Sequence, residues 1–312
     1  MWMLSYSLQH LVFFVLFFRS SINCRSTLKR ELKNPETVFG GVFLFETDLP
    51  TKSYRVDESF KHQVPLQDLR SIPGTPDLNT DGFTYVSGRP VKGIKDLEEL
   101  SDDHYDALVA DSIELVKELT GAKSAFSYVA GFRDHTSPET PKPVSAIHSD
   151  LSAEGAEFAK QLTQAILLSS EDPEEYKFGR YLQEDGKNVV IVNVWRPIHT
   201  VQDHHLGICK WDSSLKEDAM RWRLEPSNLD NALQPWRYRE GQSWWYLSDM
   251  RPDEAYVFMQ HDSRAKEDGH GINVPHASFT FKKDANKPST RMSFESSVIA
   301  IIKSSPTQAT ST

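Results

Sequence analysis

Two short patterns bring together residue types that bind metal ions and anions: a His-x-Asp triplet, and a later histidine followed by Arg-x-Ser. His148 and Asp150 follow Val144-Ser-Ala-Ile147 in a stretch that we predict to be extended. In an extended chain residues i and i+2 face the same side, so an imidazole and a carboxylate at this spacing can converge on one ion. The other such triplet, His104-Tyr-Asp106, lies in a predicted helix, where the two side chains point roughly 200° apart. We therefore predict metal ligands at His148 and Asp150.

A third ligand has to come from elsewhere in the chain. His276 opens a run in which alternation places His276, Ser278 and Thr280 on one face of a predicted strand. His261 and His270 are the competitors for this role. His270 stands between two glycines in a predicted loop, so we rank it behind His276.

The last predicted strand begins with a positively charged residue. Arg291 and Ser293 stand two residues apart at its start, so both side chains face one side. A guanidinium can hold a carboxylate through two charge-assisted hydrogen bonds, and a serine hydroxyl can donate another. We expect Arg291 and Ser293 to bind an anionic group.

The order His-x-Asp, distant His and Arg-x-Ser fits one kind of chemistry. Two imidazoles and one carboxylate form a facial triad for iron(II) that leaves three coordination positions free. Those positions suit a bidentate 2-oxo acid and then dioxygen, while Arg291 would grip the second carboxylate of 2-oxoglutarate. The sequence therefore predicts iron(II), 2-oxoglutarate and O2 as cofactors, with His148, Asp150 and His276 as the metal ligands and catalytic centre.

Three further polar residues are candidates for contact with a substrate. Asn193 and Arg196 flank Trp195, and they fall on opposite faces if the predicted strand is regular. Arg196 can pair a substrate carboxylate or form an internal salt bridge. Arg133 comes shortly before the metal-binding stretch, with Asp134 as an ordinary partner, and is the third candidate.

The overall charge argues against a nucleic-acid partner. The 312 residues include 35 Lys+Arg and 44 Asp+Glu, for a formal net charge of −9, whereas nucleic-acid binding depends on a basic surface. With 38% hydrophobic and 11% aromatic residues, the chain can bury a full core. The two cysteines, Cys24 and Cys209, exclude a disulfide framework and favour a reducing compartment.

The elements that must position these residues fall into two regions. Apolar residues recur at helical spacing from Asp96 to Gly121, which predicts one amphipathic helix ending at the glycine. After Ser145, short apolar or alternating runs separated by Gly, Pro, Asn and Asp are typical of a β-sandwich or barrel. The elements predicted there are a helix at 153–169 and strands at 188–195, 255–259, 276–281 and 291–302.

The two ends of the chain give little evidence about function. The apolar run Leu11 to Phe18 is far shorter than the roughly 20 residues that span a bilayer, so we expect no integral membrane span. We expect a cytoplasmic location, and the apolar run keeps a secretory or membrane-associated location as the alternative. Residues 304–312 read as a disordered tail.

Several blocks in a fixed order resemble the gibberellin desaturase-like and cephem methoxylase-like group of fungi and bacteria. The resemblance runs from about Asn79 to Val298. The matching blocks are Ile147 to Ala156, Val192 to Ile198, Trp244 to Glu254, His261 to Ser263, Pro275 to Phe279 and Arg291 to Glu295. One departure is His204-His205, where the group usually has an aromatic residue and a proline.

The resemblance implies an iron(II)/2-oxoglutarate-dependent dioxygenase of secondary metabolism. It implies a mainly β fold, with a double-stranded β-helix (jelly roll) core and flanking N-terminal α/β elements. The same three ligands and Arg291 would form the site. We accordingly divide the chain into an apolar extension (1–27), one dioxygenase domain (28–303) and the tail. Within the domain, 28–143 would be the α/β support and 144–303 the jelly roll, with an insertion at about 199–244.

The leading functional hypothesis is hydroxylation, desaturation or cyclisation of a small secondary metabolite, with release of succinate and CO2. The expected partner is a small-molecule substrate, and a homodimer is the oligomeric state that we consider beside a monomer. A second hypothesis, which the cephem methoxylase resemblance suggests, is a non-catalytic accessory subunit of an oxygenase or methoxylase complex. A third, zinc hydrolysis by the same ligands, leaves Arg291 and Ser293 without a purpose.

Overall fold

The structure is a computed structural model that describes most of the chain between residues 64 and 302. The described ranges are 64–91, 101–137, 143–182, 184, 187–220, 226, 228–229, 232–265, 272–281 and 289–302, with the backbone of 43–45 and 54–56. Within them the protein is mainly β, as expected from the sequence. None of the described helices is both long and apolar enough to cross a membrane.

Five antiparallel strands form one sheet, in the spatial order β4-β11-β7-β13-β5. The strands are β4 (Phe83–Val86), β5 (Ser124–Asp134), β7 (Asn188–Pro197), β11 (Ala255–Asp262) and β13 (Met292–Ile302). The three central strands are almost wholly buried, because one face packs against helix and the other faces the interior. This explains their near-continuous apolar runs.

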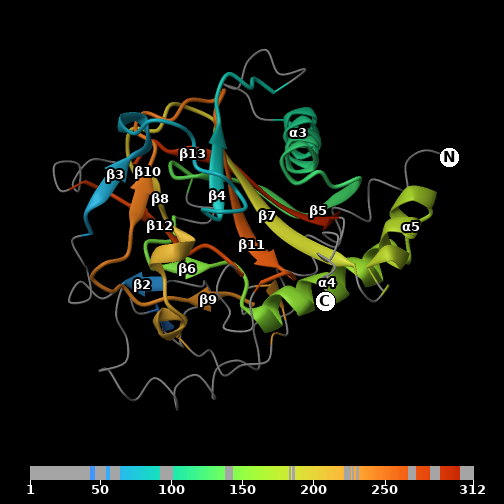
Figure 1. The fold of residues 1–312 in the computed structure, drawn as a ribbon. Coiled ribbons are helices and arrows are strands. Elements are labelled where there is room, and N and C mark those ends of the chain that lie inside the picture. Colours follow the sequence, from blue (N-terminus) through green and yellow to red (C-terminus); the bar gives the residue numbers. More distant parts are fainter. Residues whose placement is uncertain are drawn as a thin grey trace.

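A second sheet has the order β3-β10-β8-β12-β6-β9. Its strands are β3 (Leu66–Asp68), β6 (His148–Ser149), β8 (His205–Cys209), β9 (Gln234–Pro235), β10 (Trp244–Tyr246) and β12 (His276–Phe279). These strands are short, and the pairing of β10 with β3 is parallel while the others are antiparallel. A separate hairpin pairs β1 (Phe43–Phe45) with β2 (Tyr54–Val56). Figure 1 shows the two larger sheets beside each other.

Helix α3 (Asp102–Thr120) covers the outer face of the five-stranded sheet, against β5, β7 and β13 (Figure 1). It begins at Ser101, whose hydroxyl accepts a bond from the backbone N–H of His104 while the His104 ring accepts one from the N–H of Ser101. It ends at Gly121, whose φ of 68° is left-handed and suits a glycine. The predicted helix and its end are confirmed, and residues 96–100 lie outside the described ranges.

Helix α4 (Ala153–Leu167) starts three residues after Asp150 and is followed by α5 (Pro173–Tyr181). Ser152 caps α4, since its hydroxyl accepts from the N–H of Gly155. A Cβ at Gly155 would stand 2.0 Å from the carbonyl oxygen of Ala232, so the close backbone contact there requires glycine. The start of α4 is thereby held firmly beside the metal-binding stretch.

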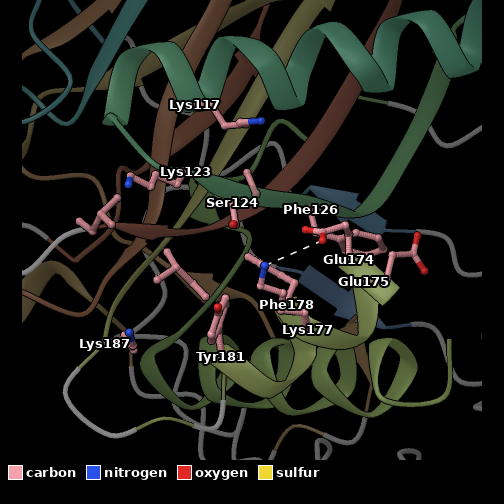
Figure 2. Close-up of a pocket in the computed structure, with 13 residues that line it drawn as sticks. Lys117, Lys123, Ser124, Phe126, Glu174, Glu175, Lys177, Phe178, Tyr181 and Lys187 are labelled. Carbon is pink, nitrogen blue, oxygen red and sulfur yellow. Dashed lines mark ion pairs between the residues drawn. The ribbon is translucent and has the colours of Figure 1, made fainter. Parts of the chain in front are cut away.

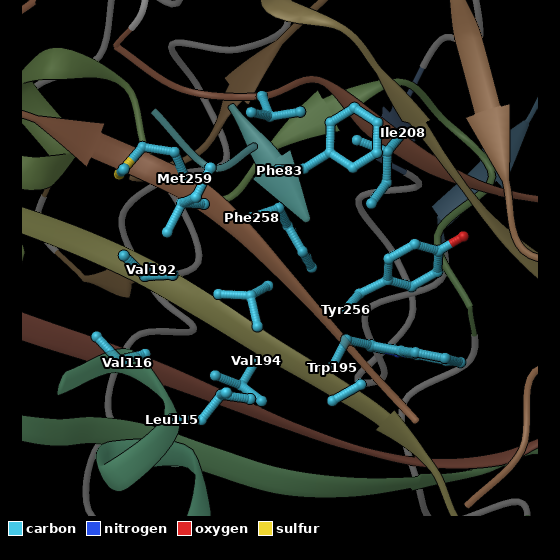
Figure 3. Close-up of a cluster of buried hydrophobic side chains, with 14 of the residues drawn as sticks. Phe83, Leu115, Val116, Val192, Val194, Trp195, Ile208, Tyr256, Phe258 and Met259 are labelled. Atoms are coloured by element: carbon cyan, nitrogen blue, oxygen red, sulfur yellow. The ribbon is translucent and has the colours of Figure 1, made fainter. Parts of the chain in front are cut away.

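The main hydrophobic core packs on both faces of the five-stranded sheet, because it includes Leu115 and Val116 of α3 as well as Ile208 of β8. Figure 3 shows Val192, Val194 and Trp195 of β7 packed near Tyr256 and Phe258 of β11. Phe83 of β4, Ile208 of β8 and Met259 of β11 also contribute, and all these side chains are at most 2% exposed. At roughly 1.5–3 kcal/mol for each large apolar side chain, this burial is the main force that holds the two sheets and α3 together.

Strands of the two sheets also lie outside the region that the sequence assigned to the core. β4 and β5 belong to the region predicted as α/β support, yet they are the two edges of the five-stranded sheet. β8 and β9 lie in the predicted insertion, yet β8 pairs with β10 and β12 inside the second sheet. Sequence alternation in these segments is weak because several of their residues are buried on both faces. The extension 1–27 and the tail 304–312 lie outside the described residues.

A buried ion pair joins the five-stranded sheet to α3. Arg196 of β7 is 2% exposed and its Nη2 lies 2.6 Å from Oδ2 of Asp111. The same guanidinium donates to the carbonyls of Arg89 and Pro252, and Arg89 also pairs with Asp111. This arrangement compensates a charge that would otherwise be costly to bury.

We predict that Asp111→Ala lowers the free energy of unfolding by about 3 kcal/mol or more, because it leaves the Arg196 charge buried and uncompensated. Urea unfolding followed by circular dichroism measures the change. Glu174→Ala is the control: it removes a surface pair with Lys177 whose side chains are 85% and 54% exposed, so the change should stay within about 0.5 kcal/mol. Equal effects of the two variants would contradict the structural role of this pair.

Candidate metal centre and co-substrate site

The two histidines predicted as ligands are direct neighbours across adjacent strands. His148 of β6 pairs with His276 of β12 in antiparallel register. Their ring centroids lie 4.4 Å apart, and both residues are buried. The pairing explains how ligands separated by well over one hundred residues reach one place.

Each of these rings is held through the same nitrogen. Nδ1 of His148 lies 2.8 Å from the carbonyl oxygen of Ala146, and Nδ1 of His276 lies 3.2 Å from that of Val274. Because a carbonyl can only accept, these bonds place the proton on Nδ1 and leave a lone pair on Nε2. Metal-binding histidines are commonly oriented in this way.

Asp150 completes the group. Its Oδ1 lies 3.5 Å from Nε2 of His148 and 3.7 Å from Nε2 of His276. Burial acts to raise the pKa of Asp150, but the nearby His276 and His148 outweigh it and hold the pKa well below its usual range. Burial, together with repulsion from His148, lowers the pKa of His276 to about 4. An ionised aspartate and a neutral histidine are the states that bind a metal ion.

Arg291 is a buried cation that forms no ion pair with a described carboxylate. Its Nη1 donates to the carbonyl of His204 and lies 3.3 Å from the hydroxyl of Ser278, and its guanidinium stacks 4.9 Å from the ring of Trp195. Nε has no hydrogen-bond partner. Burial, followed by the charge of Arg133, lowers the pKa of Arg291 to about 9. The charge is therefore present at neutral pH and available to an anion.

The position of Arg291 relative to the triad fits a five-carbon diacid. Ser278 follows His276 by two residues on β12, so the contact of Arg291 with Ser278 places the guanidinium about 7 Å along the strand from His276. Ser293 lies beside it, fully buried, and its hydroxyl has no partner. Buried donors without acceptors are costly. The unmatched Arg291 Nε and Ser293 hydroxyl therefore fit a carboxylate of 2-oxoglutarate, and the nitrogen and oxygen ligands of the triad fit iron(II).

The inner face of β13 continues beyond the two residues that the sequence singled out. Alternation places Arg291, Ser293, Glu295 and Ser297 on one face. Glu295 pairs with Arg133 of β5 at 3.4 Å. Burial, followed by the charge of Asp150, raises the pKa of Glu295. Arg133 thus lies close to the site, and its described ion-pair partner is Glu295, where the sequence suggested Asp134.

Two irregularities in the five-stranded sheet aim further side chains at the site. The register between β11 and β7 shifts at Gln260, whose Oε1 accepts a 2.8 Å bond from the backbone N–H of Asp150. The register between β13 and β5 shifts at Tyr128, which is half-buried and lies near Ser297 and Asp150. Bulges often redirect side chains in this way. Neither residue could be predicted from the sequence, because a bulge leaves no signal in a simple alternating pattern.

The structure separates the two polar residues of β7. Asn193 faces the triad and donates from Nδ2 to Oδ2 of Asp150 and, at 2.8 Å, to Glu295. Arg196 faces the opposite side and is occupied by Asp111. The expectation that Arg196 contacts a substrate is therefore wrong, and its alternative, an internal salt bridge, is correct.

A second group of possible ligands, His135, Asp203 and His204, lies beside Arg291. The carboxylate of Asp203 accepts from the hydroxyl of Ser289 at 2.6 Å and from the N–H and hydroxyl of Thr290 at 2.9 and 3.0 Å. These bonds anchor the residues that precede Arg291, so we interpret the group as support for the arginine. His205 is buried among Tyr246, Phe279 and Phe281.

A cavity of about 880 Å³ lies elsewhere, between the end of α3, the start of β5, α5 and the end of β13. Figure 2 shows its lysines, among them Lys117, Lys123 and Lys187, around Phe126 and Tyr181. It includes none of the triad residues, so it is separate from the candidate metal centre.

Comparison with known proteins agrees with this chemistry. Hydroxylase/desaturase efuI of Hormonema carpetanum is 25% identical over 259 residues, which cover 74% of this chain and 81% of that protein. The gibberellin cluster GA4 desaturase of Gibberella fujikuroi is 24% identical over 298 residues, covering 76% and 86%. The latter match confirms the resemblance to gibberellin desaturase-like enzymes.

A solved structure of the iron and alpha-ketoglutarate-dependent endoperoxidase NvfI has a TM-score of 0.60 to this chain at 19% identity, covering 84% of this chain and 90% of that one. At this identity the likeness shows a shared fold. The family model described as oxidoreductase/YMDC permease-like domain matches residues 40–301. The chain therefore belongs to the oxidoreductase/YMDC permease-like domain family, in which its relatives include hydroxylase/desaturases and a gibberellin cluster desaturase.

Proposed function

We propose that this protein is an iron(II)- and 2-oxoglutarate-dependent dioxygenase that hydroxylates, desaturates or cyclises a small secondary metabolite. The observation that carries the proposal is the placement of a buried, unpaired guanidinium about 7 Å along β12 from a His-Asp-His group. In hydroxylation, one oxygen atom of O2 enters the C–H bond of the substrate. The other enters succinate as 2-oxoglutarate loses CO2.

The roles of the site residues follow from their geometry. His148, Asp150 and His276 would hold iron(II), and Arg291 with Ser293 would bind the distal carboxylate of 2-oxoglutarate. Bound iron supplies the capacity to activate dioxygen, which protein side chains lack. The chain orients the reactants and excludes water, since both histidines, Arg291 and Ser293 are buried. The side chain of Asp150 is the exception, because it is 34% exposed. We infer that a substrate approaches from the side of Asp150.

Arg133 is the residue that we propose for contact with a substrate. Its side chain is 30% exposed, and its charge acts on Asp150, His276 and Arg291. Its ion pair with Glu295 fixes the guanidinium at the edge of the site. The relatives named as desaturases and hydroxylases support a small-molecule substrate without defining it.

We also propose that the two sheets are the halves of a jelly roll. The interior placement of the triad between them and the fold shared with NvfI support this. One dioxygenase domain over 28–303, a cytoplasmic location and a homodimer stay predictions. No observation favours an accessory subunit or a zinc hydrolase, since neither function uses the unmatched polar atoms of Arg291 and Ser293.

We predict that His276→Ala reduces iron(II) affinity by more than the roughly 10–100-fold that loss of a second-shell partner costs, because a direct ligand is removed. Anaerobic titration of metal-free protein with iron(II) measures the loss. His261→Ala is the control, since His261 lies outside the described His-Asp-His groups. If His276→Ala binds iron(II) like the unmodified protein while His261→Ala does not, the third ligand has been misassigned.

We predict that Arg291→Met weakens 2-oxoglutarate binding by at least about 30-fold, or about 2 kcal/mol, through loss of a buried charge-assisted contact. The visible charge-transfer band of anaerobic iron(II) protein, titrated with 2-oxoglutarate, reports this affinity. Ser293→Ala should weaken it less, since it removes one neutral donor. Iron(II) stoichiometry should be unchanged in both variants. An Arg291→Met variant with normal 2-oxoglutarate affinity would refute the assignment.

A further inference from the structure

The two carboxylate oxygens of Asp150 face different partners. Oδ1 lies 3.5 Å from Nε2 of His148 and 3.7 Å from Nε2 of His276, so it faces the position where the two imidazoles converge. Oδ2 accepts a hydrogen bond from Nδ2 of Asn193. The carboxylate is therefore turned so that one oxygen points into the triad and the other is bound to an amide of β7.

The amide of Asn193 is itself fixed. Its Oδ1 accepts a 2.8 Å bond from the hydroxyl of Ser297, its direct register partner on β13. Its second Nδ2 proton goes to Oε1 of Glu295, also at 2.8 Å. A flipped amide would turn its oxygen toward two carboxylate side chains, so these bonds allow a single orientation. Asn193 is fully buried, and no room is left for it to rotate away.

We propose that Asn193 is a positioning residue that keeps Asp150 a one-oxygen ligand. The inference rests on the proposed function, because it concerns how the triad presents itself to iron(II). A facial triad leaves three positions free only if its carboxylate takes one. An aspartate that turned both oxygens inward would occupy a position needed for 2-oxoglutarate or dioxygen. Holding Oδ2 outside the triad prevents this.

The backbone and side chain of Asp150 are fixed from different strands. Gln260 of β11 accepts from the Asp150 N–H at 2.8 Å, while Asn193 of β7 holds the carboxylate. The first contact sets where the residue lies, and the second sets how its carboxylate is rotated. Asn193 therefore acts on the triad through Asp150, a role different from the substrate contact expected from the sequence.

The test compares Asn193→Leu with the unmodified full-length protein. Leucine has a similar branched shape and fills the buried position without a donor. Anaerobic iron(II) protein is titrated with 2-oxoglutarate at saturating metal, and the charge-transfer band gives the affinity. We expect Asn193→Leu to bind one iron(II) and to bind 2-oxoglutarate at least 10-fold more weakly. A purely structural role of Asn193 would change the thermal midpoint but leave this affinity unchanged at saturating metal.

Thr163→Val is the matched control. Thr163 is buried in α4, where its hydroxyl donates to the carbonyl of Ala159, away from the triad. The change also replaces a buried polar group by an apolar one of the same shape, so it should leave iron(II) and 2-oxoglutarate affinities unchanged. Loss of affinity in Thr163→Val equal to that in Asn193→Leu would overturn the proposal, because the effect would then be general.

Ser297→Ala covers the case in which Asn193→Leu does not fold. It removes only the bond that fixes Oδ1 of Asn193, so we expect a smaller loss, about 3-fold, in the same direction. Normal 2-oxoglutarate affinity in whichever of the two variants folds contradicts the role of Asn193. Failure of the unmodified protein to bind iron(II) would contradict the proposed function itself, so the two failures are distinguishable.

Discussion

The pairing of His148 with His276 across β6 and β12 is the contact on which the rest of the site depends. β6 has only two residues, so its backbone ladder alone supplies few bonds. Side chains supply the others: Trp236 donates to the hydroxyl of Ser149, which donates to Asn273, whose amide donates to the carbonyl of Leu151. This buried network holds Ser149, which lies between His148 and Asp150, and Leu151, which directly follows Asp150. A short strand can therefore hold two ligands in place.

The five-stranded sheet supplies the polar groups that surround this contact. The inner face of β13 carries Arg291, Ser293, Glu295 and Ser297, and bulges add Gln260 and Tyr128. Polar groups at such depth are costly to bury unless they are paired. Most of them are paired with one another here. The unmatched atoms among them, on Arg291, Ser293 and Gln260, are therefore informative about what the protein binds.

Two buried arginines differ in whether a carboxylate pairs with them, and this difference distinguishes a structural role from a binding role. Arg196 and Arg291 are 2% and 5% exposed. Arg196 meets Asp111 at 2.6 Å and joins β7 to α3. Among the described residues, Arg291 contacts a carbonyl, a serine hydroxyl and an aromatic face, and no carboxylate forms an ion pair with it. A neutral environment leaves its charge free for a dianion, which an acidic chain of net charge −9 would otherwise repel.

The sequence by itself determined the residue types at fixed short spacing: the His-x-Asp and Arg-x-Ser pairs, the helix that ends at Gly121, and the strands containing Val192, Val257 and Val298. These features depend on local backbone periodicity, which can be recognised within a single segment of the sequence. The tertiary structure alone decided that His276 is the histidine that faces His148. It also decided that Arg196 forms an ion pair with Asp111, and that Asn193, Glu295 and Gln260 surround Asp150. Those outcomes depend on strand register and on bulges between segments far apart in the chain. A shift of one residue would turn each side chain to the opposite face, and no single segment records that choice.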